Sequence, residues 1–494
     1  MKKLILLCGA FAVLAMSAFA QSDDDFFGGS SDDSFFSDDD LFGDDSMFGD
    51  DTIVEVSDVS SKSDLSKGVI FNSGSIKVGG SVSASLSSNT LLYAPDDETT
   101  FGNKVYNTKL TPDLSGMLTV DARPTETLRM YTKFGFAYPF VDKASVNYAM
   151  MPLEFGTFGK VGELPVASGA SISNWFKLKE LFTDFSYKDT AFFRFGIHTV
   201  TWGAGYFFSP VSDMINSSSI DPENPDKQVD GSLNLRTQII IPNTQNCLWF
   251  YVIPSTDFTN QTSESYARDT ALAGKADILL GAWELGLGGY WKYQNAPKAM
   301  LTATGSLRKT SFFGEFVYSY GAADEWLKNA DWDDKTSIFQ ATAGFSHYWK
   351  DPKINIAAQY YWESNQKDFA QKISLYGHNV AFTASKGDLF KNSDLSLSLF
   401  AMANIGHKDA TSEDIENMIL ANPMLAMELN SPEKIAEAAK NASAMPALTA
   451  NVMLNYTPFN DVRVSAGPVL SFKEFDEKPS VSFKLTATLG GGKF

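Results

Sequence analysis

Apolar and polar residues alternate along most of the chain from about residue 68 onward. In Leu128–Tyr138 the even-numbered positions are mainly apolar, whereas the odd-numbered positions include Arg129 and Lys133. The same alternation returns in Leu395–Ala401 and in Val481–Leu489. Successive side chains of a β-strand point to opposite faces, so a period of two predicts strands with one apolar and one polar face rather than helices.

We count about 18 segments of this kind, and most have the roughly 9–11 residues that a tilted strand needs to cross a membrane. Their predicted ranges are 75–88, 113–123, 127–138, 176–187, 190–201, 234–242, 246–254, 269–281, 283–293, 297–307, 310–320, 336–349, 352–364, 376–386, 394–405, 447–457, 460–472 and 480–490.

The connections between these segments alternate between short and long. The short series is 123–126, 188–189, 243–245, 282, 308–309, 350–351, 387–393 and 458–459. The long series is 89–112, 139–175, 202–233, 255–268, 321–335, 365–375 and 406–446, with 294–296 and 473–479 as shorter members. Transmembrane β-barrels sort their connections in this way, with short periplasmic turns and long outer loops. The fold class predicted is therefore all-β, a transmembrane antiparallel up-and-down β-barrel of about 16–18 strands that spans residues 68–494.

Two short helices are predicted within the outer loop 406–446. Ile415, Met418 and Ile419 share one helical face after Ser412. A second helix is expected at 434–440, because Ser431-Pro432 supplies a capping serine and a proline for the first turn. These helices either roof or enter the pore, or they decorate the surface.

Composition and chain ends agree with an exported barrel. Aromatic residues make up 13% of the chain, and they gather near predicted strand ends, as at Trp202 and Trp349. The chain ends in Phe494, as many bacterial outer-membrane barrels do, although Gly490–Lys493 interrupts the usual alternation before it. Cys247 is the one cysteine after residue 20, so no internal disulfide is expected. The net charge of −19 excludes a basic nucleic-acid footprint.

The first 67 residues differ in composition from the rest. Residues 1–20 have a basic start, a short apolar core and an Ala18-Phe19-Ala20 end, which predicts a signal peptide and export toward an outer membrane. Residues 21–67 are expected to be a disordered acidic segment in the periplasm, with 12 aspartates between Asp23 and Asp51. This segment is either a solvated leader or a set of docking motifs for a periplasmic partner, whose anchors would be Phe26, Phe27, Phe35, Phe36, Phe42 and Phe48.

One region carries a recognisable pattern. Leu178–Asp184 is followed by Arg194-Phe195-Gly196, by Trp202-Gly203-Ala204-Gly205, and by Phe208-Ser209-Pro210 with Asp213 and Ile215-Asn216. This arrangement resembles an uncharacterised porin-like family of outer-membrane proteins, in which a strand hairpin leads into a loop that begins at the Trp-Gly. The acidic repeats are similar to those of predicted outer-membrane barrels of spirochaetes. The resemblance implies a barrel and leaves the solute open.

The same region predicts a charged wall inside the barrel. If the apolar positions face lipid, then Glu180, Asp184, Arg194, His198 and Arg236 face the lumen together. Either they form salt bridges that stiffen the wall, or they form a charged constriction that selects solutes. Other charges expected in the lumen are Arg129, Lys133, Glu315, Glu363, Arg463 and Lys484.

No enzyme is predicted, because the four histidines stand in separate segments and no nucleophile, metal or phosphate motif accompanies them. No cofactor and no metal are expected. The expected partners are outer-membrane lipid and the barrel-assembly machinery. The polar inner face predicts a channel for passive passage of small polar solutes. Two alternatives are a carrier of hydrophobic ligands such as fatty acids, which needs about 14 strands and an apolar route near Ala149–Phe155, and a surface adhesin or structural barrel.

Overall fold

The computed structural model of the chain describes most of the predicted barrel. The described residues are 71–72, 75–94, 108–138, 147–154, 160–168, 176–188, 190–216, 220, 229–255, 262–322, 325–326, 329–364, 377–405, 412, 416, 431–442, 447–459, 461–475 and 478–493. The predicted signal peptide, the acidic segment with its six phenylalanines and the helix expected near Ile415 lie largely or wholly outside these residues.

The elements are almost all strands. They are β1 Phe71–Asn72, β2 Ile76–Tyr93, β3 Lys109–Thr125, β4 Leu128–Tyr138, β5 Asn147–Glu154, β6 Lys160–Ser168, β7 Phe176–Tyr187, β8 Ala191–His198, β9 Ser232–Ile240, β10 Cys247–Ile253, β11 Ala271–Leu280, β12 Trp283–Lys292, β13 Lys298–Leu307, β14 Thr310–Tyr320, β15 Ser337–Trp349, β16 Ile354–Glu363, β17 Gly377–Lys386, β18 Leu395–Ile405, β19 Leu448–Phe459, β20 Val462–Phe472 and β21 Ser480–Lys493. The helices are α3 Ser263–Asp269, α7 Pro432–Ala442 and the single turns η5 Ser212–Met214 and η6 Leu389–Lys391.

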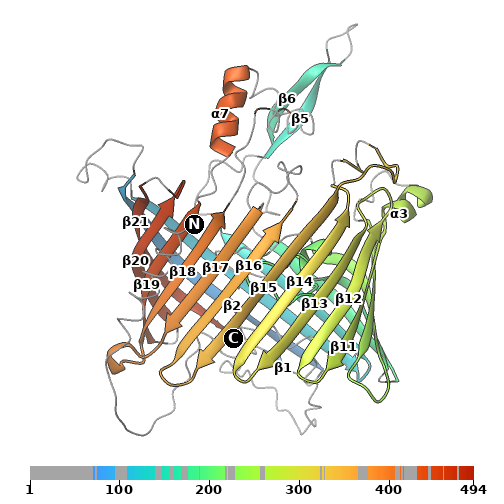
Figure 1. The fold of residues 1–494 in the computed structure, drawn as a ribbon, viewed down its shortest axis with the longest axis horizontal. Coiled ribbons are helices and arrows are strands. Elements are labelled where there is room, and N and C mark those ends of the chain that lie inside the picture. The colour runs from blue at the N-terminus through green and yellow to red at the C-terminus, as the bar shows by residue number, and fades with distance from the viewer. Residues whose placement is uncertain are drawn as a thin grey trace. The chain divides into compact units, whose positions relative to one another are not determined.

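Eighteen of these strands close into one antiparallel barrel. Each strand from β7 to β21 pairs with the next one along the chain, and β4 pairs with both β3 and β7. The ring is completed by β2, which pairs with both β3 and β21. The short β1 pairs with β2 at Val78 and Lys77, beyond the last β21 partner at Ser81. The predicted fold class is confirmed, and each of the 18 predicted segments overlaps one barrel strand. Figure 1 shows these strands side by side and oblique.

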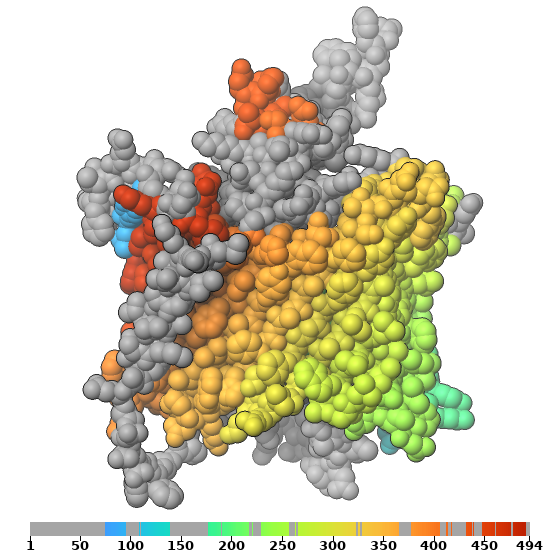
Figure 2. Space-filling view, in the orientation of Figure 1, coloured from blue at the N-terminus to red at the C-terminus, as the bar shows by residue number. Residues whose placement is uncertain are grey.

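The outer face of the barrel is apolar. Exposed large apolar side chains occupy alternate positions in strand after strand, for example Phe250 and Val252 of β10 beside Leu272 of β11, the register partner of Val252. Figure 2 shows the continuous outer surface made by the strands from β11 to β18. Water would not favour so large an apolar surface, whereas bilayer hydrocarbon would. Within the described residues no helix is long and apolar enough to cross a membrane.

The connections follow the predicted alternation. One end of the barrel carries turns such as 308–309, and the other carries most of the long connections, such as 199–231 and 406–447. The range 139–175 was predicted as a loop, but it contains the separate hairpin β5–β6. The helix predicted at 434–440 is confirmed as part of α7, where the Lys434 N–H donates to Ser431 Oγ at 3.3 Å.

Candidate functional site

The connection after β8 begins by folding along the inner side of the barrel. We call residues 199–216 the lumen loop. Its two ends are tied together, because the Val200 N–H donates to Asn216 Oδ1 at 2.8 Å and Asn216 Nδ2 donates to the Val200 carbonyl at 2.8 Å. Further along the connection, Asp230 binds Lys177 and Lys179 of β7. Partial burial raises the pKa of Asp230, but these two lysines outweigh it and hold that pKa below its usual value.

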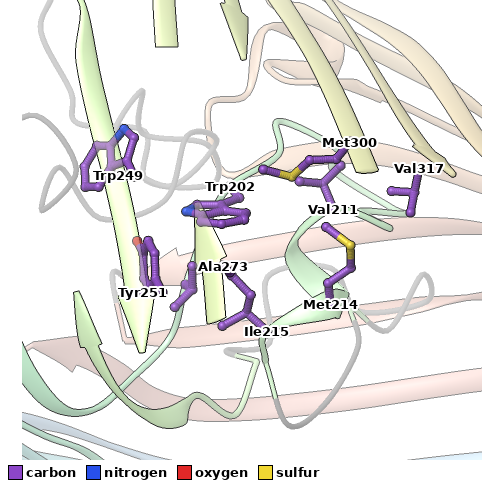
Figure 3. Packing of buried hydrophobic residues seen from close by; sticks show 10 residues of the cluster. Trp202, Val211, Met214, Ile215, Trp249, Tyr251, Ala273, Met300 and Val317 are labelled. Carbon is purple, nitrogen blue, oxygen red and sulfur yellow. The ribbon is translucent and has the colours of Figure 1, made fainter. Parts of the chain in front are cut away.

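Apolar side chains of the lumen loop pack against inward-facing wall residues. Trp202, Val211, Met214 and Ile215 meet a patch on β10, β11, β13 and β14 (Figure 3). The wall side of this patch consists of Trp249, Tyr251, Ala273, Met300 and Val317. Phe207 and Phe208 form a second cluster with Tyr361, Ala381 and Met402 on β16, β17 and β18. The lumen loop therefore follows the wall from β10 to β18.

Three polar side chains of the wall hold the backbone of the lumen loop. Lys275 of β11 donates to the Trp202 carbonyl at 2.9 Å. Glu315 of β14 accepts from the Gly205 N–H at 2.8 Å and from the Val211 N–H at 3.1 Å. Gln359 of β16 accepts from the Phe207 N–H at 2.7 Å and donates to the Phe208 carbonyl at 2.6 Å. These bonds satisfy backbone groups of a loop that has no strand partner of its own.

The glycines of the Trp-Gly-Ala-Gly motif allow this close approach. A Cβ atom at Gly203 would lie 1.9 Å from Glu315 Oε1, and one at Gly205 would lie 1.9 Å from the Phe208 carbonyl oxygen. Ser212 adds an internal brace, since its Oγ accepts from the N–H groups of Trp202 and Gly203 at 3.1 Å. The Trp-Gly-Ala-Gly motif, on which the family resemblance rests, therefore favours the conformation in which the loop packs against the wall.

An ion-pair row crosses the inner face from β3 to β8. Arg129 of β4 binds Asp121 of β3, with Nη2 to Oδ2 at 3.0 Å, and its Nη1 lies 3.8 Å from Asp184 Oδ2 of β7. Arg194 of β8 binds Asp184 through Nε at 2.6 Å and Nη2 at 2.9 Å. We call these four residues the ion-pair row. The bidentate Arg194–Asp184 pair fixes both side chains, because the guanidinium fork matches a carboxylate.

The other residues predicted for the charged wall surround this row. Arg236 is the register partner of Arg194, and its guanidinium lies 5.4 Å from the centre of the Trp249 ring. His198 is buried at the end of β8 with its ring 5.9 Å from that of Phe182, and Glu180 pairs in register with Lys133. The structure therefore brings the predicted residues to one inner face. Their role in selecting solutes stays a prediction.

The remaining predicted lumen charges are scattered. Glu363 is buried and accepts from the Tyr361 hydroxyl at 2.6 Å and from Gln340 Nε2 at 3.2 Å. Arg463 stands on β20, and Lys484 is exposed on β21 opposite Asn89 of β2. Glu315 was predicted as a lumen charge, and it lies on the inner face, where the lumen loop covers it and leaves 4% of it exposed.

A second sector of the inner face is polar and half-exposed. It runs over β19, β20, β21, β2 and β3, whereas the loop contacts described above all go to β10–β18. Its hydroxyl and amide groups bond to one another, with Ser465 Oγ donating to Asn455 Oδ1 at 2.7 Å and Ser87 Oγ lying 3.1 Å from Thr486 Oγ1. The sector comprises the half-exposed Ser81, Ser83, Ser85, Ser87, Ser115, Ser465, Thr486 and Thr488, together with the exposed Asn89 and the buried Asn455. Small hydroxyl side chains leave room for water beside them.

Three residues of this site were missed from sequence. Lys275, Asp277 and Gln359 hold or border the lumen loop, and Lys275 pairs with Asp277 at 2.9 Å. The available signal was a charged or amide side chain at an inward position of an otherwise apolar strand. Among the described residues, no three His, Cys, Asp or Glu side chains gather closely enough to hold a metal ion.

Replacing Gly196 of the Arg-Phe-Gly motif with alanine is expected to destabilise the barrel by about 2 kcal/mol. Gly196 has φ +141°, and an added Cβ would lie 2.1 Å from the Leu181 carbonyl oxygen. Urea unfolding of the refolded protein in detergent would measure the change. The control is Gly314→Ala, where the nearest atom to the new Cβ is 3.5 Å away. Equal stability of the two variants would contradict the expectation.

Comparisons with known proteins find matches among solved structures alone. No protein-family model matches the sequence, and no curated protein matches it. Among solved structures, OccK9 (OpdG) of Pseudomonas aeruginosa matches with TM-score 0.43 and 8% identity over 83% of this chain and 98% of its own. OccK11 (OpdR) of the same organism matches with TM-score 0.42 and 8% identity over 84% and 95%. The outer membrane channel DcaP of Acinetobacter baumannii matches with TM-score 0.38 and 11% identity over 85% and 98%. At these values the likeness assigns neither a family nor a solute.

Proposed function

We propose that the chain is an outer-membrane channel through which small polar solutes pass passively. The observation that carries the proposal is that the lumen loop covers one part of the inner face and leaves another, polar part uncovered. The lumen loop lies against β10–β18, whereas β20, β21, β2 and β3 present half-exposed hydroxyl groups and the exposed Asn89. Polar groups along a wide barrel favour a water-filled path, and an inward loop narrows it.

The apolar outer face supports insertion in a membrane, because closed barrels satisfy every strand hydrogen bond without water. We further propose export through the predicted signal peptide, delivery by barrel-assembly machinery, and a periplasmic position for the acidic repeats. The fatty-acid carrier would need about 14 strands, and the barrel has 18. Nothing in the described residues favours the adhesin, whose expected loop, 406–446, is described only in part.

Refolded protein of residues 21–494 is expected to give stable, salt-dependent current steps in a planar bilayer. A water-filled path conducts in proportion to the salt concentration, whereas a closed carrier does not. Heat-modifiable migration on a gel would show that the barrel is folded in the same sample. Folded protein that stays silent over a range of voltages would overturn the channel proposal.

Replacing Ser85 and Ser87 with leucine provides a matched test of the path itself. Both side chains belong to the polar sector, and bulky apolar groups there are expected to lower conductance by about half. Ala84 and Leu86 lie on the opposite face of the same strand, so Ala84→Leu is the control and should leave the current unchanged. Equal effects of the two changes would place the conducting path elsewhere.

A further inference from the structure

Glu315 holds the lumen loop through neutral donors. Its Oε1 accepts from the Gly205 N–H at 2.8 Å and lies 3.1 Å from Ser209 Oγ. Its Oε2 accepts from the Val211 N–H at 3.1 Å and lies 3.2 Å from the same Ser209 oxygen. The carboxylate thus bridges two backbone N–H groups six residues apart in the loop and uses most of its accepting capacity on them.

No cation neutralises this buried carboxylate in the part of the chain that the structure describes. Lys275 is the inward cation of β11, and it is engaged with Asp277 and with the Trp202 carbonyl. The register neighbours of Glu315 on β13 and β15 are Thr302 and Thr342, which do not titrate. The remaining acids that face this part of the lumen are Asp213 of the lumen loop, Glu363 of β16 and Glu284 of β12.

Protonation changes what the carboxyl group can do for the loop. A carboxylate accepts from all three donors, whereas a carboxylic acid must place one O–H among them and loses accepting capacity. The new O–H can donate to Ser209 Oγ, because that hydroxyl can donate to Ser212 Oγ instead. The uncharged carboxyl group, however, binds the Gly205 and Val211 N–H groups less strongly than the carboxylate does. The wall behind the loop is closed by strands, so a segment that leaves Glu315 moves into the lumen.

We propose that Glu315 is the positioning residue of the constriction, whose ionised carboxylate holds the stretches around Gly205 and Ser209–Val211 against the wall, and that acid loosens these stretches toward the lumen and narrows the channel. This inference rests on the proposed channel function. Gln359 and Lys275 keep Phe207, Phe208 and Trp202 attached. The displacement is therefore confined to the segments that Glu315 and Ser209 hold between these points.

The first test needs no variant. Single-channel current of the wild-type protein is recorded at low voltage from about pH 8 to about pH 4, the range over which a glutamate can gain a proton. The expected result is a reversible fall of about twofold or more in mean current, through longer closed times or a lower step. A current without pH dependence would overturn the inference and leave the channel function standing. No current at any pH would instead contradict the channel function.

Two variants assign the pH response to the proposed group. In Glu315→Gln the uncharged amide mimics the protonated acid, so its current at neutral pH should match that of wild type in acid and should not change with pH. Glu284→Gln is the control, because the Glu284 carboxyl group of β12 makes no hydrogen bond to the lumen loop among the described residues. Its current should respond to pH as that of the wild type does. A Glu315→Gln channel that still closes in acid would overturn the assignment, and the gel assay would confirm that it is folded.

Discussion

Replacing Trp202–Ile215 with a short Gly-Ser connection is expected to raise the single-channel conductance roughly two- to fourfold. This segment fills the inner side of β10–β18 with two apolar clusters. The connection can be short, because Val200 and Asn216 are hydrogen-bonded to each other and stay in place. Removing the segment opens that half of the lumen to water.

The barrel is expected to survive this change. Its strand hydrogen bonds do not involve the lumen loop, and water would solvate Glu315 and Lys275 once the loop is gone. The exclusion limit for neutral sugars of graded size should rise together with the conductance in a liposome-swelling assay. The control replaces α7, Pro432–Ala442, with a linker of similar length. A loop-replaced channel with wild-type conductance and exclusion limit would show that the lumen loop does not limit passage.

Neutralising Arg236 and Asp184 is expected to shift the ion selectivity of the channel in opposite directions. The ion-pair row together with Arg236 holds three guanidinium groups and two carboxylates, which leaves one surplus positive charge. Arg236→Gln removes that surplus and should weaken any preference for anions. Asp184→Asn enlarges it and should strengthen that preference. The sign follows from the attraction of counter-ions to fixed charge in a narrow, partly desolvated passage.

Reversal potentials across a tenfold salt gradient measure this shift. A perfectly selective channel gives about 59 mV for a monovalent salt, and each variant should move the potential by roughly 10 mV, with opposite signs. Lys309→Gln, in the turn between β13 and β14, is the control and should move it little, because that side chain is exposed outside the strands. Shifts of the same sign, or none, would favour the purely structural interpretation of the salt bridges.

The stability of Asp184→Asn and Arg236→Gln further separates a structural role of the salt bridges from a role in ion selectivity. Asp184 accepts two hydrogen bonds from Arg194 and also faces Arg129. The Asp184→Asn change therefore removes the carboxylate that pairs with Arg194, whose side chain is 8% exposed. Arg236 rests on the Trp249 ring instead. We therefore expect Asp184→Asn to lower the midpoint of urea unfolding more than Arg236→Gln does.

The barrel itself was determined by the sequence. Alternation with period two fixes which side chains share a face, so it located all 18 strands and set Glu315, Arg194 and Asp184 on the inner face. The sorting of connection lengths gave the up-and-down topology, because antiparallel neighbours need only short turns at one end. Local chemistry likewise predicted α7 from Ser431 and Pro432.

The course of the lumen loop was decided only by the tertiary structure. The range 202–233 was predicted as an outer loop, yet its first part docks inside the barrel on Glu315 and Gln359, which lie 110 and 152 residues away from their partners Gly205 and Phe207. The hairpin β5–β6 within 139–175 was missed in the same way. Alternation reports the two faces of one strand, but it carries no information on which distant loop will cover an inner face. That choice depends on buried hydrogen bonds and close packing that form once the barrel has closed.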